Sequence, residues 1–85
     1  MAIPLTQLEI LWLSNTPIGS AGAKDLAALK GLQKLHLSHT LIADDALVSL
    51  AALTNLQEIT LINVRITDPA VAEFQKKLPK CKVLR

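Results

Sequence analysis

The feature that most constrains this chain is an internal repeat of 24 residues. Sliding the sequence against itself by that distance superposes residues of matched chemistry in seven columns. A fixed period of this length indicates a stacked repeat architecture, in which each repeat is one supersecondary unit. We divide the chain into unit 1 (residues 8–31), unit 2 (32–55) and unit 3 (56–80), with a closing segment at 78–85. The columns are Leu8, Leu32 and Leu56; Leu11, Leu35 and Ile59; Leu13, Leu37 and Leu61; Thr16, Thr40 and Val64; Ile18, Ile42 and Ile66; Ser20, Asp44 and Asp68; and Leu26, Leu50 and Phe74.

Each unit changes its hydrophobic period part-way along. Its first half alternates apolar and polar residues, as a strand with one buried face does. The second half has helical spacing, as in Leu47, Leu50 and Leu53. We expect a first strand at 9–14 and helices at 20–29, 44–53 and 68–78. The column of Ser20, Asp44 and Asp68 is suited to N-caps, Pro69 to the first helical position, and Pro79 to ending the last helix.

Neither a strand nor a helix of this length can bury its apolar face alone. Stacking three units buries those faces together, so the pattern predicts an α/β fold with a parallel sheet on one side and helices on the other. Eighty-five residues allow a single domain, 1–85. The composition agrees, because 51% of the residues are hydrophobic but only 2% are aromatic, which suits thin aliphatic layers.

The whole chain resembles the leucine-rich-repeat proteins, and most of all the bacterial type with L-x-x-L-x-L-x-x-T-x-I-T-D units. Ile66-Thr67-Asp68 matches that signature, whereas Ile42-Ala43-Asp44 and Ile18-Gly19-Ser20 are looser copies and Val64 departs from the threonine column. The resemblance implies a curved solenoid with the sheet on its concave side and the helices on its convex side. It also implies binding to other macromolecules, with no cofactor and no catalytic residues.

The residues between the inward leucines are predicted to point outward from the sheet and to bind a protein partner. Adjacent strands lie about 4.8 Å apart, so equivalent residues form rows across the units. Trp12 is the most informative of them, because tryptophan is enriched at binding hot spots. The turn residues Asn15, His39 and Asn63 should follow at the strand ends. The predicted binding rows are Ile10, Lys34 and Glu58; Trp12, His36 and Thr60; and Ser14, Ser38 and Ile62.

The first strand predicts a second kind of interaction. No polar module precedes it in this sequence, and Leu5 falls in the column of Leu29 and Leu53. An open strand edge with apolar residues beneath it favours association. Either the chain is a fragment of a longer array, or copies of it self-assemble as a homodimer or larger homo-oligomer, in a natural or engineered unit. The predicted edge consists of Leu5, Leu8, Glu9, Leu11 and Leu13.

Sites for chemistry are not evident. His36 and His39 are three residues apart on a strand, which turns them to opposite sides, and no third ligand stands near, so we expect no metal site. Ser38 and His36 share a strand face without an obvious carboxylate to orient the imidazole. Cys81 falls at an apolar position, which favours a buried structural thiol. We expect no enzyme activity.

The charge pattern and hydropathy limit the partners further. A net charge of +2 does not by itself indicate nucleic acid. Positive residues gather near the C-terminus, where they fit a polar terminal cap better than an anion-binding patch. No apolar run approaches the roughly 20 residues of a membrane span, and no signal peptide is evident, so we expect a cytoplasmic protein without membrane contact. The positive residues are Lys76, Lys77, Lys80, Lys82 and Arg85.

Overall fold

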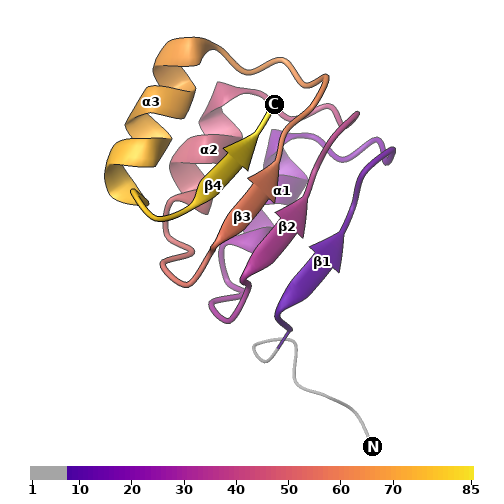
Figure 1. Cartoon of the computed structure of the whole chain (residues 1–85). Helices are drawn as coiled ribbons and strands as arrows, with labels where there is room; N and C mark the ends of the chain where they lie inside the picture. Colours follow the sequence, from indigo (N-terminus) through magenta and orange to yellow (C-terminus); the bar gives the residue numbers. More distant parts are fainter. Residues whose placement is uncertain (1–7) are drawn as a thin grey trace, which may run out of the picture.

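The computed structural model describes residues 8–85 and arranges them in alternating strands and helices. The four strands form one parallel sheet in the order β1-β2-β3-β4. Figure 1 shows the three helices together on one side of this sheet, which leaves its other side open. The predicted α/β class with a parallel sheet is confirmed. The elements are β1 (Ile10–Trp12), α1 (Ser20–Leu26), β2 (Lys34–His36), α2 (Asp44–Leu50), β3 (Glu58–Thr60), α3 (Asp68–Lys77) and β4 (Lys82–Leu84).

The sheet keeps the sequence period in its register. Leu11 pairs with Leu35, Leu35 with Ile59, and Ile59 with Val83, so each step along the sheet is 24 residues. The fourth strand was not predicted, since the positive residues of the closing segment 78–85 indicate only a terminal cap. Its signal was present, because Val83 continues the apolar column while Lys82 continues the row of Lys34 and Glu58.

The core lies between the sheet and the helices. The central leucines of unit 2 are completely buried, and their equivalents in unit 3 are nearly so. In unit 1 the same positions, Leu8, Leu11 and Leu13, are only partly buried, because no unit among residues 8–85 packs on that side. The fully buried side chains are Leu32, Leu35, Leu37, Ile42, Leu47, Leu50, Leu53 and Ile59, together with Ala23 and Ala46.

The first two helices are shorter than expected, ending at Leu26 and Leu50 rather than at 29 and 53. The chain continues beyond them in turns in which several N–H groups bond to the carbonyl three residues back, as from Leu29 to Leu26 and from Leu53 to Leu50, both at 3.0 Å. This tighter turn satisfies free carbonyls at the helix end. The apolar spacing therefore continues beyond the end of each α-helix, so the spacing alone does not predict where the α-helix ends. β1 is likewise shorter than the expected 9–14.

The N-cap prediction was wrong by one residue. The caps are Gly19, Ala43 and Thr67, and of these only Thr67 accepts a side-chain bond, from the Ala70 N–H at 3.4 Å. Ser20 and Asp44 are already in the first helical turn and direct their oxygens to the next unit instead. Within residues 8–85, no helix is both long and apolar enough to cross a membrane.

Candidate functional site

The open side of the sheet brings two of the predicted rows together as adjacent side chains. We call this surface the open sheet face, and it comprises the outward residues of all four strands. The register places Lys34 directly between Ile10 and Glu58, and His36 directly between Trp12 and Thr60. β4 lengthens both rows with residues that were not predicted as part of the site. The face consists of Ile10, Trp12, Lys34, His36, Glu58, Thr60, Lys82 and Leu84.

Trp12, His36 and Thr60 form a connected line across three strands. The Trp12 and His36 rings are stacked, with centroids 3.9 Å apart and planes 12° from parallel. The His36 Nδ1 atom lies 2.8 Å from the Thr60 hydroxyl oxygen in a hydrogen bond. The indole is therefore held in one orientation by its neighbour, yet Trp12 remains 71% exposed. A rigid, exposed aromatic side chain of this kind loses little conformational entropy on binding.

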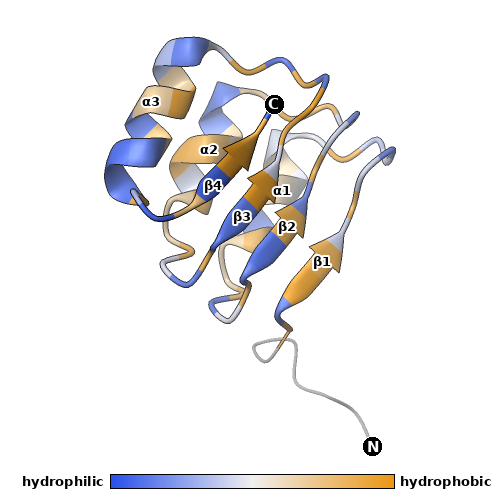
Figure 2. Ribbon diagram, in the orientation of Figure 1, coloured by the Kyte–Doolittle hydropathy of each residue, from blue (hydrophilic) through white to orange (hydrophobic). Residues whose placement is uncertain are grey.

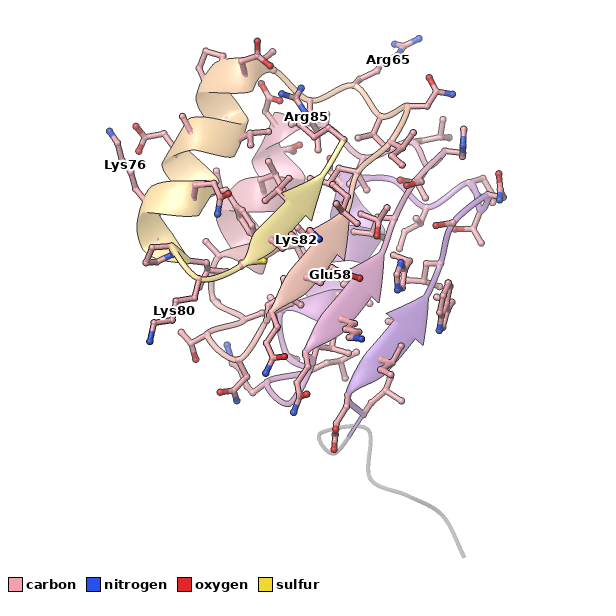
Figure 3. All side chains as sticks on the ribbon, in the orientation of Figure 1. Glu58, Arg65, Lys76, Lys80, Lys82 and Arg85 are labelled. Carbon is pink, nitrogen blue, oxygen red and sulfur yellow. The ribbon has the colours of Figure 1, made fainter. Side chains whose placement is uncertain are left out.

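Apolar and charged residues surround this line. Ile10 and Ile62 are both among the exposed large hydrophobic residues, and they lie on either side of it. Figure 2 shows that β1 is largely hydrophobic, whereas β2, β3 and β4 each begin with a hydrophilic residue. Glu58 lies between Lys34 and Lys82 in the register, and Figure 3 labels Glu58 and Lys82 on neighbouring strands. The ion pairs formed within residues 8–85 lie elsewhere, so Lys34 and Glu58 are neighbours in the register that do not form an ion pair.

The third predicted row does not belong to this surface as a whole. Ser38 is only 7% exposed, so the prediction that it projects outward to a partner was wrong, whereas Ser14 is partly buried and Ile62 is exposed. The reason is a hydrogen-bond relay between units. The Ser14 hydroxyl oxygen accepts from the Ser38 N–H at 3.1 Å, and the Ser38 hydroxyl oxygen accepts from the Ile62 N–H at 3.0 Å. These hydroxyls hold the ends of successive strands together.

A second relay joins the segments that lead into the helices. The Ser20 hydroxyl oxygen accepts from the Ala43 N–H at 3.1 Å. Both carboxylate oxygens of Asp44 accept from Thr67, one from its N–H and one from its hydroxyl, each at 2.8 Å. A hydrogen bond from Ser20 also lowers the pKa of the Asp45 carboxyl. The column that the sequence suggested for caps therefore ties each unit to the one after it.

The turns that follow the strands share one backbone conformation. Asn15, His39 and Asn63 all have positive φ angles, of 65°, 59° and 57°. Asn and His are among the residue types found most often in this left-handed region. His39 also pairs with Asn63, with the His39 Nδ1 and Asn63 Nδ2 atoms 3.0 Å apart. The two histidines thus have separate local partners, His36 with Thr60 and His39 with Asn63.

Other candidate groups are held in structural roles. Ser38 does not meet His36, because its oxygen is bonded to the Ile62 amide. Cys81 is buried as predicted, and burial, with a smaller effect of the Glu58 charge, raises the pKa of its thiol to about 11. Across the described part of the chain, no three His, Cys, Asp or Glu side chains gather in a group that could hold a metal ion.

Two features outside the sheet face were not predicted. An apolar groove runs between α2 and α3, lined by Leu47, Val48 and Phe74, with Asp45 and Lys77 also at its wall. Val48 is 70% exposed there, and Leu41 is 69% exposed in the loop before α2.

Of the predicted association edge, Leu8, Leu11 and Leu13 are partly buried and Glu9 is exposed, while Leu5 lies outside the described residues.

No protein-family model matches the chain, and no curated protein gives a significant match.

Proposed function

We propose that this chain is a leucine-rich-repeat solenoid of the bacterial type that acts as a non-catalytic protein-binding module. Three observations support the solenoid. The 24-residue period of the sequence is also the register of the sheet, the leucine columns point into the layer between sheet and helices, and side-chain relays join each unit to the next. In such a solenoid the open sheet face is the concave surface, which repeat proteins use for binding.

The observation that carries the binding role is the state of Trp12. It is the only tryptophan of the chain, it is 71% exposed, and His36 holds it in place. Burying a large aromatic side chain in a partner is a typical source of hot-spot energy. Ile10 and Ile62 add apolar area near it, whereas Lys34, Glu58 and Lys82 supply the charged rim that sets orientation and specificity.

The polar groups near Trp12 already form hydrogen bonds within the chain, which favours a binding role over a catalytic one. The Ser38 hydroxyl is bonded to a backbone amide and the His36 Nδ1 atom is bonded to Thr60. Cys81, with a pKa near 11, is protonated at neutral pH and is a poor nucleophile. These groups stabilise the sheet and orient Trp12, and we assign none of them a chemical step.

The test compares three alanine variants of side chains that are equally exposed on different surfaces. The wild-type chain, immobilised, is used to isolate a protein from its source cells, and the dissociation constant of that purified protein is then measured. Trp12→Ala should weaken binding by roughly thirtyfold or more, the size of a hot-spot effect. Leu41→Ala and Val48→Ala, whose side chains are 69% and 70% exposed, should leave it unchanged.

The outcome that contradicts the proposal is equally definite. If Val48→Ala weakens binding and Trp12→Ala does not, the partner uses the groove between α2 and α3. Because Trp12 is the only tryptophan, its fluorescence provides a second readout. A partner without tryptophan should shift its emission to shorter wavelength on binding, and an unchanged spectrum would place the interface elsewhere.

A further inference from the structure

Backbone hydrogen bonds show which way each strand residue of a unit faces. In unit 2, alternate residues direct their polar backbone groups toward unit 1. Lys34 donates its N–H to the Glu9 carbonyl at 3.0 Å. The His36 carbonyl accepts from the Leu13 N–H, and the Ser38 carbonyl accepts from the Asn15 N–H, both at 2.9 Å.

The equivalent residues of unit 1 have no such neighbour within residues 8–85. By the 24-residue register they are Ile10, Trp12 and Ser14, so their N–H and C=O groups face the outer edge of β1. No other strand of the described chain pairs there, since β1 is at the end of the sheet order. Unpaired groups of this kind are a template for adding a strand.

The layer beneath this edge is also incompletely covered. Leu11 is partly exposed, whereas its equivalents Leu35 and Ile59 are completely buried. Leu8 and Leu13 differ from their equivalents in the same direction. The edge therefore offers a line of hydrogen-bonding groups above a strip of apolar surface. A matching partner must supply both a strand and apolar side chains.

The opposite end of the sheet does not offer such a match. Lysine on an edge strand discourages further pairing, and Lys82 occupies β4. The Arg85 side chain also folds back there, binding the Asp68 carboxylate and, at 2.9 Å, the carbonyl of Ile66. Open head-to-tail stacking of β1 on β4 is therefore disfavoured. A closed arrangement must use the β1 edge twice.

We propose that two copies of this chain pair along the outer edges of their β1 strands, antiparallel about a two-fold axis beside Trp12. This geometry satisfies the outward groups of all three edge residues, because Trp12 faces its own copy and Ile10 faces Ser14 of the second copy. Glu9 then faces Asn15, so no like charges oppose each other across the axis. The two leucine strips meet beneath, and the two open sheet faces become one. This inference is independent of the foreign partner proposed above.

The test uses the full chain and a pair of substitutions at one site. Ile10→Pro removes an outward N–H that β1 does not use to bond β2, and proline is tolerated at the first residue of a strand. Ile10→Ala removes the side chain but keeps the N–H. Sedimentation equilibrium should give a dimer for wild type and for Ile10→Ala. Ile10→Pro should weaken dimerisation by roughly tenfold or more, since the two-fold axis doubles each lost bond.

A second pair guards against misfolding of the proline variant. Trp12→Lys places two lysines opposite each other at the axis and should give a monomer, whereas Val48→Lys adds the same charge on α2 and should remain a dimer. Circular dichroism must show folded chains for each. Three results would overturn the proposal: a wild-type monomer at millimolar concentration, a dimer unaffected by both edge variants, or assemblies that grow without limit as concentration rises.

Discussion

The two ends of this sheet differ although they are built from the same repeat. At the β4 end, Val83 continues the apolar column, Lys82 marks the edge strand, and Arg85 binds back to Asp68 and Ile66. At the β1 end, three leucines are partly exposed and the edge residues are Ile10 and Trp12. The β4 end is partly covered by charged side chains, although its Val83 is also only partly buried, whereas the β1 end presents apolar groups and backbone hydrogen-bonding groups.

This difference shows that burial in a repeat protein depends on neighbours more than on residue type. Leu11 and Leu35 are the same residue at the same place in their units, yet among residues 8–85 only Leu35 has a strand on both sides. A repeat surface that lacks one neighbour is therefore the natural place for an interaction. Both proposals, the foreign partner and the second copy, involve the β1 side of the molecule.

The largest expected effect on the free energy of unfolding comes from truncating leucine to alanine at equivalent positions of units 1 and 2. Leu35→Ala removes a completely buried leucine and should lower the free energy of unfolding by about 2–5 kcal/mol. Leu11→Ala, at a partly exposed position, should cost roughly half as much or less. Urea unfolding followed by circular dichroism, at a concentration where the chain is monomeric, measures both. Equal losses would contradict the view that unit 1 is the less tightly packed end.

A smaller effect is expected from breaking the serine relay. Ser38→Ala leaves the Ile62 N–H without its acceptor and should cost about 1–2 kcal/mol. Ser14→Ala removes the equivalent acceptor for the Ser38 N–H, at the less buried end, and should cost less, about 0.5–1 kcal/mol. The same unfolding experiment compares the two variants. If Ser38→Ala is neutral, the relay does not stabilise the junction between units.

The Cys81 thiol makes the β4 end sensitive to alkaline pH. Burial raises the pKa of this thiol from 9.0 to about 11, so the folded state holds its proton more tightly than the unfolded state does. The stabilisation is therefore fully present below pH 9 and is lost as pH rises toward 11. Cys81→Ala should show a shallower fall in unfolding free energy over pH 9–11 than wild type. Identical slopes in the two proteins would contradict this assignment.

The smallest expected effect is that of His39→Asn. His39 lies in the turn of the middle unit and has the positive φ angle that Asn15 and Asn63 have in the flanking units. Asparagine tolerates this conformation well, so His39→Asn should raise the unfolding free energy by about 0.5 kcal/mol or less. His39→Val, with a β-branched side chain, should lower it by about 1 kcal/mol or more. Thermal unfolding compares the three proteins, and a stabilising valine would refute the role given to this backbone conformation.

The sequence was sufficient to predict the three units, the approximate positions of their strands and the neighbours within each row, but not β4. The 24-residue spacing alone places Trp12 beside His36, because parallel strands in constant register align equivalent residues. It could not predict that the Ser14 and Ser38 hydroxyls bond to the backbone of the next unit, since a small hydroxyl side chain can face either solvent or a backbone group. The relay through Ser20 and Asp44 could not be predicted either, because both are typical N-cap residues and their bonds to the next unit depend on how the units are stacked.

Site-resolved hydrogen exchange tests the central claim most directly, which is that the β1 side of the molecule is less well packed than units 2 and 3 and is the side on which a second copy pairs. The full chain is measured first at a concentration where it is monomeric. Amides of Leu35 and Leu37 in unit 2, and of Ile59 and Leu61 in unit 3, should exchange slowly, while those of Leu11 and Leu13 exchange fastest among the equivalent positions. Raising the concentration should then slow exchange in β1 selectively, the Trp12 amide included. Equal protection of all three units in the monomer, or a concentration effect at β4 instead of β1, would contradict the account.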